Sequence, residues 1–305
     1  MSQESKDFAL LHIIVLVWGT TAILGLLISI PSVELVFYRT GFAAIGLWFV
    51  LKGSRRSFRI SSNRDWIMVG SVGFLIAAHW ILFFLAARVA NASVCLAGMA
   101  TTSLWTSLLE PVYFKKKVRL FEVILSLLAF AGMIVIFKIE TEYVLGLSLA
   151  VLSAFLAACF TVLNASLTRK YDHFVITFYE MSSATILIAV FFPVYTQTIR
   201  PEGLKMIPDA TVEWIYILTL AILCTVWAYS YSIKLMKRLS AFAVNLTVNL
   251  EPVYGIVLAL LIFGESEKMS GGFYTGTGLI MLAVLLYPLL NRFYRNKAVE
   301  TDVLR

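Results

Sequence analysis

Long apolar stretches without charge alternate along this chain with short clusters of charged and turn-forming residues. A membrane-spanning helix needs about 20 largely apolar residues, because about 30 Å of hydrocarbon is crossed at a rise of about 1.5 Å per residue. Lipid offers no partner to free backbone groups, and the stretches are longer than the roughly 10-residue strands of a barrel. We therefore predict ten transmembrane helices, at about 8–30, 32–51, 66–87, 90–114, 120–137, 144–167, 174–195, 212–233, 240–263 and 271–291.

The composition supports a membrane protein and argues against a soluble one. Hydrophobic residues make up 60% and charged residues 14%, against about 45–50% and about 25% in soluble domains. The net charge of +7 does not form a basic patch, because Lys and Arg occur in short clusters between the apolar stretches. We therefore expect a lipid bilayer as the surroundings and no nucleic acid as a partner.

The positions of the basic residues predict the orientation. Of the 25 Lys and Arg residues, 19 lie in the N-terminus, the C-terminus and the loops at 52–65, 115–119, 168–173 and 234–239. The alternate loops hold only five, and Arg39 lies within a span. Because basic loops stay in the cytoplasm, both termini are predicted to be cytoplasmic.

Short matches indicate an internal repeat of five helices. Residues 37–39 match 178–180, residues 65–67 match 213–215, and residues 93–94 match 243–244, at offsets of 141, 148 and 150. An odd number of helices per repeat means that the two halves are inserted in opposite orientations, as in many secondary transporters. We predict one repeat over 1–139, a second over 140–293 and a cytoplasmic tail over 294–305.

One repeated motif does not fit this register. The sequence Leu-Glu-Pro-Val-Tyr occurs at 109–113 and again at 250–254, at an offset of 141 in a region that otherwise aligns at 150. Glu110 then falls near the cytoplasmic end of its span, whereas Glu251 falls near the middle of another. We expect that these two glutamates are not equivalent.

The arrangement of motifs resembles the drug/metabolite transporter superfamily, with two EamA-type halves over essentially the whole length. The resemblance rests on Trp18-Gly19 in the first span, Pro252 in the ninth, Gly264-Glu265 after it, and Gly276 and Gly278 in the last span. The first half departs from the family pattern, since Thr101-Thr102 replaces a common proline and Lys116 stands near the usual glutamate. The resemblance implies a ten-helix permease that exports small metabolites such as amino acids.

Ionisable residues inside spans are the main functional candidates, because each costs at least about 2.5 kcal/mol to insert. Arg39, Glu251 and His79 are predicted at depths within about 4 Å of one another. In one interpretation they form a central site, in which Arg39 holds an anion and Glu251 or His79 binds an amine or a proton. In the other, Arg39 and Glu251 only neutralise each other. Glu180 could be a gate or the partner of a cytoplasmic basic residue, but we favour an interfacial charge that reaches toward water. Glu110, near Lys115–Lys117, is interpreted in the same way.

Polar and aromatic side chains extend the candidate site. Asn245 and Asn249 share a face of the ninth span, and Pro252 predicts a kink there. Further candidates for binding or coupling are Asn164, Thr101, Trp18, Trp80, Trp227, Tyr229 and Tyr231. Interhelical hydrogen bonding and packing are the alternatives for these residues.

We therefore predict a secondary transporter of small metabolites, such as amino acids or related amphipathic compounds, that works by alternating access. Proton coupling and uncoupled exchange are both compatible, as are a monomer and a homodimer. The alternative is a membrane-embedded enzyme acting on a lipid or small molecule. No cofactor or metal is expected, since the three cysteines lie in three different spans. The expected location is a bacterial inner membrane.

Overall fold

The computed structural model describes residues 3–139, 141–264 and 270–303, and all its regular elements are helices. The first half of the chain contains α1 (Gln3–Trp18), α2 (Thr21–Leu26), α3 (Ser32–Gly53), α4 (Asn63–Val89), α5 (Ala92–Met99), α6 (Thr102–Phe114) and α7 (Leu120–Ile139). The second half contains η1 (Thr141–Tyr143), α8 (Val144–Leu167), α9 (His173–Thr198), α10 (Glu213–Ala221), the π-helix η2 (Ile222–Tyr229), α11 (Ser230–Leu235), α12 (Ala241–Val248), α13 (Glu251–Phe263) and α14 (Gly271–Val303).

The prediction of an all-helical membrane protein is confirmed. Among the described residues, nine helical segments are long and apolar enough to cross a membrane, and the apolar stretch Leu120–Gly132 of α7 is a shorter tenth. Apolar side chains on the outer surface, such as Val112 and Leu261, are each 77% exposed and suit contact with lipid. Helix α14 continues to Val303, so most of the tail predicted at 294–305 is helical.

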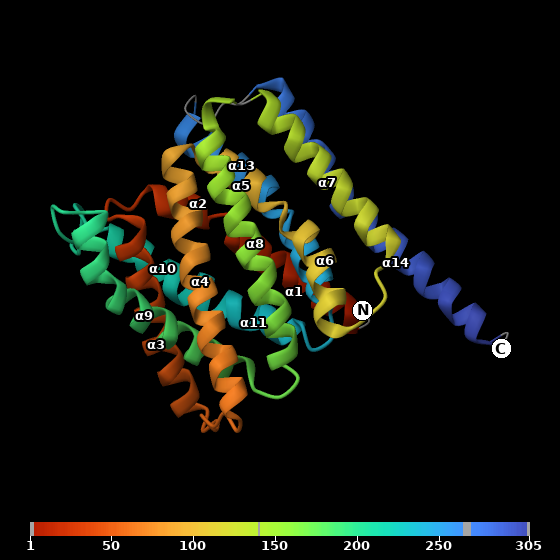
Figure 1. The fold of residues 1–305 in the computed structure, drawn as a ribbon, viewed down its shortest axis with the longest axis horizontal. Coiled ribbons are helices and arrows are strands. Elements are labelled where there is room, and N and C mark those ends of the chain that lie inside the picture. Colours follow the sequence, from red (N-terminus) through yellow and green to blue (C-terminus); the bar gives the residue numbers. More distant parts are fainter. Residues whose placement is uncertain (1–2, 140, 265–269, 304–305) are drawn as a thin grey trace.

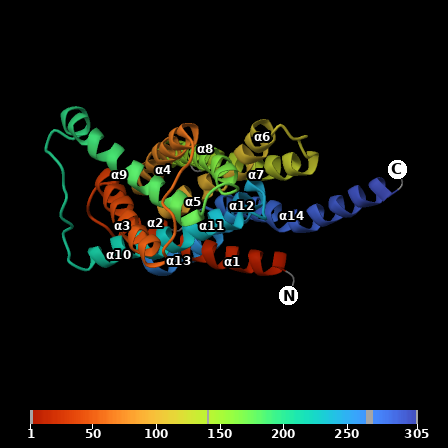
Figure 2. The same cartoon turned by 90° about the horizontal axis from the view of Figure 1, so that it is seen from below.

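The helices form a central bundle with one peripheral pair. Helices α4 and α8 pack against each other, as do α3 and α9. Helices α7 and α14 run side by side along one edge, and α14 extends beyond the bundle toward the C-terminus (Figure 1). The view from below shows the long connection between α9 and α10 on the opposite side from that pair (Figure 2).

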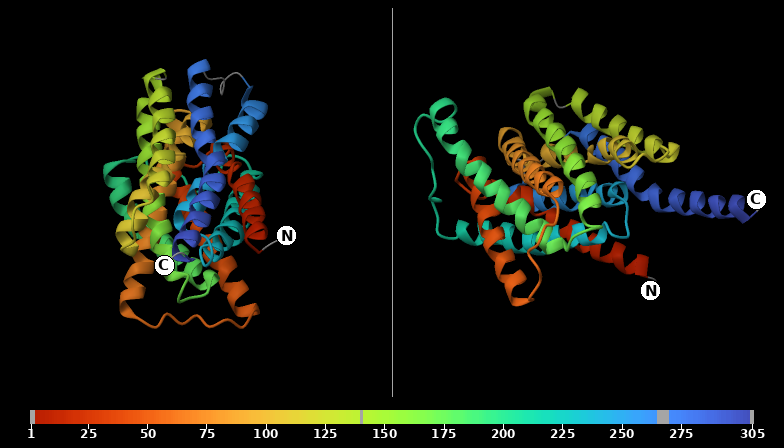
Figure 3. Two further views of the ribbon diagram at one scale, coloured as in Figure 1. Left: turned by 90° about the vertical axis from the view of Figure 1, so that its right-hand side faces the viewer. Right: turned by 60° about the horizontal axis from the view of Figure 1, so that its bottom comes forward.

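Equivalent helices of the two halves begin at nearly constant offsets. Helix α9 begins 141 residues after α3, whereas α12 and α13 each begin 149 residues after α5 and α6. The α3–α4 connection lies at the bottom of Figure 1 and the α9–α10 connection at its upper left, so these corresponding connections lie at opposite ends. Both termini lie toward the end that carries the α3–α4 connection (Figure 3).

This register resolves the repeated Leu-Glu-Pro-Val-Tyr motif. Glu251 is the first residue of α13, and its counterpart at the start of α6 is Thr102. Glu110 lies two turns further along α6, where its carboxylate accepts a hydrogen bond of 2.7 Å from the backbone N–H of Phe242 near the start of α12. The two glutamates therefore occupy different places, as the sequence comparison indicated.

Gly73 allows α4 to approach α9 closely. A Cβ atom at Gly73 would lie 2.7 Å from the carbonyl oxygen of Glu180 and 2.7 Å from Cβ of Ser183. Gly73→Ala is expected to destabilise the protein by about 1–3 kcal/mol, because the two helices must separate. Thermal unfolding of the purified protein in detergent measures this loss. Gly70→Ala, one turn away, is the matched control, since its Cβ would lie 3.8 Å from Ser183 Oγ in ordinary contact. Equal unfolding temperatures of the two variants would contradict the close approach.

Candidate functional site

Three membrane-spanning segments are interrupted in mid-span, and a fourth changes its winding. The interruptions separate α1 from α2, α5 from α6, and α12 from α13. In the fourth, the π-helix η2 replaces α-helix for eight residues, and the Thr225 hydroxyl donates to the carbonyl of Leu220, five residues earlier, at 2.9 Å. Such features often occur at functional sites, because they leave backbone groups and side chains in unusual positions.

Side-chain hydrogen bonds join two of the interruptions. Asn249, at the break before α13, donates from Nδ2 to Ser103 Oγ at 2.8 Å, and Asn245 donates from Nδ2 to Thr106 Oγ1 at 2.8 Å. Pro252 lies in the first turn of α13, where a missing N–H costs little. The helix axis is therefore interrupted before the proline, at residues 249–250, and the expected kink is a full break.

An internal cavity of about 90 Å³ lies where these segments meet. Both halves of the chain contribute to its wall. Eight of the predicted site residues line it, namely Trp18, Arg39, His79, Trp80, Asn164, Tyr229, Asn245 and Glu251. The sequence prediction did not include most of the rest of the wall, of which Thr21, Phe160 and Thr161 are examples. Thr161 lies one turn from Asn164 and Thr21 one turn from Trp18, so helical spacing from the predicted residues could have found both.

Arg39 brings a positive charge to the cavity. Its side chain is buried, its Nε donates to Thr225 Oγ1 at 3.0 Å, and its guanidinium carbon lies 3.7 Å from the ring centroid of Trp80. In the described part of the chain, no carboxylate lies within ion-pair distance of Arg39, and neither Nη atom has a protein acceptor. Cation–π contact with a tryptophan face stabilises the charge but leaves its hydrogen-bond donors free. The arrangement suits an anionic group of a ligand.

Glu251 is the buried acidic residue of the wall. Thr21 lies next to it, with Oγ1 3.4 Å from Glu251 Oε1. As the first residue of α13, the carboxylate also lies at the positive end of the helix dipole. The interpretation that Arg39 and Glu251 merely neutralise each other through an ion pair finds no such contact among the described residues.

His79 is oriented by Ser153 on α8. Ser153 Oγ donates to the His79 carbonyl oxygen at 2.8 Å, while His79 Nδ1 lies 2.9 Å from the Ser153 carbonyl oxygen. Because that carbonyl can only accept, we assign the ring proton to Nδ1. Nε2 then keeps its lone pair, and His79 offers the cavity a hydrogen-bond acceptor.

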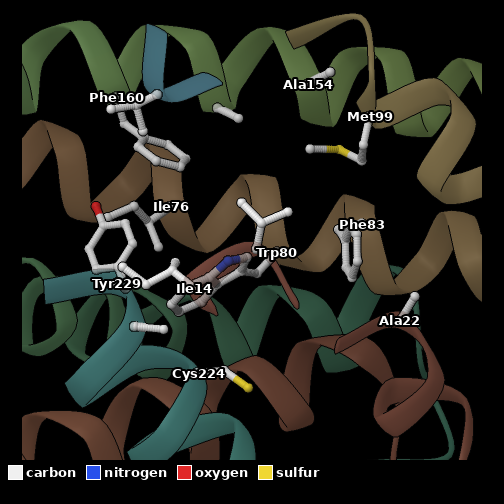
Figure 4. Packing of buried hydrophobic residues seen from close by; sticks show 14 of the residues in the cluster. Ile14, Ala22, Ile76, Trp80, Phe83, Met99, Ala154, Phe160, Cys224 and Tyr229 are labelled. Atoms are coloured by element: carbon white, nitrogen blue, oxygen red, sulfur yellow. The ribbon is translucent and has the colours of Figure 1, made fainter. Parts of the chain in front are cut away.

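Aromatic rings form much of the wall. Trp80 lies between Tyr229 and Phe83, with Phe160 near Tyr229 (Figure 4). The ring centroids of Trp80 and Tyr229 are 6.2 Å apart, and those of Phe160 and Tyr229 are 6.1 Å apart. Trp18 is held by a 3.0 Å hydrogen bond from Nε1 to the Cys224 carbonyl of η2. The wall therefore combines apolar faces with a few oriented polar groups, as ligand sites usually do.

Four predicted residues lie outside the cavity wall. The Thr101 hydroxyl donates to the Gly98 carbonyl, and the neighbouring Thr102 lines the cavity instead. Asn249 binds Ser103 instead. Trp227 and Tyr231 are two residues either side of Tyr229, which turns them to another face of the helix. Tyr231 packs against His173 there.

Glu180 differs most from its sequence-based interpretation. It was expected to reach toward water, but its side chain is fully buried. Tyr229 donates from its hydroxyl to Glu180 Oε2 at 3.1 Å, and Asn164 donates from Nδ2 to the same hydroxyl at 2.8 Å. The match of residues 37–39 to 178–180 was the signal that could have found it, because it places Glu180 opposite Arg39 in the repeat.

Polar contacts join the two halves at both ends of the bundle. At the end with the basic loops, the Asp65 carboxylate of α4 accepts from Lys170 at 3.0 Å and from the Tyr171 hydroxyl at 2.7 Å. We call this set the inner latch. At the other end, Glu213 of α10 accepts from the backbone N–H and the hydroxyl of Ser29, each at 2.7 Å. We call this set the outer latch.

The two latches occupy equivalent places in the repeat. Glu213 follows Asp65 by 148 residues and Lys170 follows Ser29 by 141, the same offsets as in the sequence matches. Asp7 and Arg238 add a second contact between the halves at the inner end, with Nη2 2.6 Å from Oδ1. This hydrogen bond raises the pKa of Arg238, because it stabilises the charged guanidinium.

Gly264 marks the end of α13, with a positive φ of 58°. Glu265, which follows it in the family motif, lies outside the described residues. Among the described residues, no group of three or more His, Cys, Asp or Glu side chains could hold a metal ion.

One family model matches almost the whole chain, in two segments. The EamA-like transporter family matches residues 8–138 and 144–288. An uncharacterized transporter of Archaeoglobus fulgidus is 24% identical over 300 residues, which cover 93% of this chain and 97% of the relative. An uncharacterized transporter of Bacillus subtilis (strain 168) is 21% identical over 291 residues, which cover 92% and 89%. A crystal structure aligns with a TM-score of 0.69 at 18% identity, over 95% of this chain and 99% of that chain, which supports the fold.

The contacts of Arg39 lead to a stability test. Removing one partner of a buried ion pair costs about 3–5 kcal/mol, because the other charge is left unpaired. Arg39 has no such partner among the described residues, so Arg39→Met should lower the unfolding free energy by no more than about 1.5–3 kcal/mol, the value of its charged hydrogen bond to Thr225. Thermal unfolding in detergent measures the change, with Glu202→Gln in the exposed α9–α10 loop as the control. A loss of several kcal/mol would show that Arg39 has a structural role instead.

Proposed function

Because this chain belongs to the EamA-like transporter family, we propose that it is a secondary transporter whose central cavity carries small metabolites with a carboxylate group. The observation that carries the proposal is Arg39, a buried cation in the cavity wall without a carboxylate partner in the described part of the chain. Such a charge is costly to keep in a membrane protein unless a ligand uses it.

The rest of the wall supports a substrate that is both charged and apolar. A carboxylate fits the free Nη atoms of Arg39, and an ammonium group fits Glu251 and the aromatic faces of Trp18 and Trp80. Amino acids and related amphipathic compounds combine these groups. The small volume of the cavity favours one such molecule over a peptide or a lipid.

Alternating access would follow from the two latches. Each joins the first half of the chain to the second, and the two lie at opposite ends of the bundle that holds the cavity. Opening one latch while the other stays closed would expose the cavity to one side of the membrane only. Since the sequence has no nucleotide-binding motif, the energy would come from a gradient. We propose that the protein lies in a bacterial inner membrane and exports its substrate from the cytoplasm. Protons are one option for the coupling ion.

The alternative function, a membrane-embedded enzyme, would need an activated nucleophile at the cavity. Ser153 and His79 come closest, with Ser153 Oγ 2.7 Å from Nδ1. However, Ser153 is fully buried, does not line the cavity, and uses its hydroxyl proton on the His79 carbonyl. This pair therefore fits a role in positioning His79 better than one in nucleophilic attack.

Transport by the cavity can be tested in proteoliposomes by counterflow of a panel of radiolabelled amino acids and related carboxylates. Arg39→Gln and Glu251→Gln should each reduce flux at least about tenfold, since losing a charged hydrogen bond costs about 1.5–3 kcal/mol. Ala157→Leu should also stop flux by filling the cavity. Ala189→Leu, at an exposed position of α9, is the matched control and should keep wild-type flux. Wild-type flux in Ala157→Leu would rule out the cavity as the path.

The latches can be tested by cysteine accessibility. Ser232 lines the cavity near the inner end, so Ser232→Cys is placed in a chain whose native cysteines are replaced by Ala. Asp65→Asn should raise the rate at which the thiol at position 232 is alkylated from the cytoplasmic side about tenfold. The reason is that the charged hydrogen bond between Asp65 and Lys170 in the inner latch is lost. Glu213→Gln, in the outer latch, should lower it. Equal rates in both variants, and in the loop control Glu202→Gln, would contradict gating by the latches.

A further inference from the structure

Glu180 is a buried acid that the transport mechanism above does not use. Its side chain has no exposed surface, and its Oε1 atom has no hydrogen-bond partner among the described residues. No Lys, Arg or His lies within ion-pair distance of it in that part of the chain. A carboxylate held in this way is expensive, so a purely structural role is a poor explanation for it.

A short hydrogen-bond chain connects Glu180 to the cavity. Asn164 Nδ2 donates to the Tyr229 hydroxyl at 2.8 Å, and that hydroxyl donates to Glu180 Oε2 at 3.1 Å. Asn164 and Tyr229 line the cavity, whereas Glu180 lies behind them. The Asn164 Oδ1 atom is buried and has no partner in the described structure. The chain therefore has a definite direction, with each donor pointing from the wall toward Glu180.

The other titratable groups on the elements around α9 have contacts elsewhere. Arg39 of α3 stacks on Trp80, His79 of α4 binds Ser153, and Tyr231 of α11 packs against His173. On α4, the uncharged Gly73 lies close to the backbone carbonyl oxygen of Glu180. On α8, Asn164 is linked to the Glu180 carboxyl through the Tyr229 hydroxyl. Tyr229 is thus the titratable group in direct contact with the Glu180 carboxyl.

We propose that Glu180 binds the coupling proton, and that its protonation reverses the Asn164–Tyr229–Glu180 hydrogen-bond chain and so changes the cavity wall. This inference rests on the proposed transport function and adds a proton site behind the wall, distinct from Glu251 and His79. Glu180 acts on the substrate through Tyr229 and Asn164, and is therefore a positioning residue.

The reversal follows from the donor and acceptor capacity of each group. When Glu180 is ionised, it can only accept, so the Tyr229 hydroxyl must donate to it. When one proton from the open side of the membrane binds at Oε2, the oxygen that faces Tyr229, the acid O–H donates to the Tyr229 oxygen. Tyr229 then needs another acceptor, which Asn164 supplies by turning its amide so that Oδ1 faces the hydroxyl. Release of the same proton to the other side restores the first arrangement. The O–H bond of the acid is the one covalent bond that forms and breaks.

The repeat supports a functional pairing of Glu180 with Arg39. The two residues lie 141 positions apart, each seven residues after the start of its helix. Arg39 contacts Trp80 and Glu180 contacts Tyr229, and these two rings are neighbours in the cavity wall (Figure 4). The site thus has a fixed cation stacked on one ring of the wall and an acid bonded to the hydroxyl of the next ring.

Infrared difference spectra of the protein in lipid, recorded while the pH is changed between about 4 and about 9, test the proposal without a substrate. The wild type should lose a carbonyl band of a protonated carboxylic acid as the pH rises. Glu180→Gln should lack this band, whereas Glu251→Gln and the exposed control Glu202→Gln should keep it. Tyr229→Phe should keep the band at a shifted frequency, because the hydrogen bond to the acid is lost.

A wild-type set of bands in Glu180→Gln would overturn the proposal, as would loss of the same band in Glu251→Gln. If Glu180→Gln does not fold, Tyr229→Phe decides, and an unshifted band overturns the proposal. The proposed function has a separate readout, the counterflow of the amino-acid panel. If the Glu180 band is present but no counterflow is measured, the proposed transport of that panel is refuted and the proton site is not. Where counterflow is present, Glu180→Gln should remove its dependence on pH, and an unchanged pH profile would refute coupling.

Discussion

Backbone polar groups in the membrane interior need partners, and this requirement decides where the helices of this chain can be interrupted. Two of the three breaks are joined to each other by the amides of Asn245 and Asn249, which bind hydroxyl groups on α6. The third, after Trp18, packs against α13, where a Cβ atom at Gly19 would lie 3.0 Å from Cβ of Tyr254. The backbone N–H groups at the breaks are satisfied locally, by bonds such as Thr20 to Val17, Thr101 to Gly98 and Leu250 to Thr247. Side-chain hydrogen bonds and close packing then hold the three interruptions next to one another, and the cavity lies where they meet.

The same region tolerates charges that the rest of the bundle excludes. Arg39 is stabilised by the face of Trp80 and by Thr225, whose own position depends on the π-helical winding of η2. The negative charge of Glu251 is stabilised by the positive end of the α13 dipole, and this helix end exists only because the span is broken. Each charge therefore depends on an irregular backbone feature nearby. Restoring regular helices would remove the support for both charges along with the cavity.

Sequence reasoning located the membrane-spanning segments from one dominant signal, the length of the apolar stretches. For the site, it singled out Arg39, Glu251 and His79 by their burial cost; all three line the cavity, and their roles stay predictions. It failed where local winding or a distant partner decides. The break at residues 249–250 directs Asn249 to Ser103, and helical rotation turns Trp227 and Tyr231 away from the cavity. Glu180 was assigned to the interface by its distance from the helix end, although Tyr229 and Asn164, which bury it, come from other helices.

The repeat explains the geometry of the site, and its departures from symmetry explain the chemistry. Equivalent positions hold Arg39 in one half and Glu180 in the other, and Thr102 in one half and Glu251 in the other. A fully symmetric pair of halves would place like charges at related positions around one cavity, which Coulomb repulsion disfavours at short range. It would also bind a substrate without distinguishing its two ends. Opposite or unlike residues at equivalent positions keep the inverted architecture and give the cavity a polarity. Under the proposed transport function, that polarity would orient a substrate with a carboxylate.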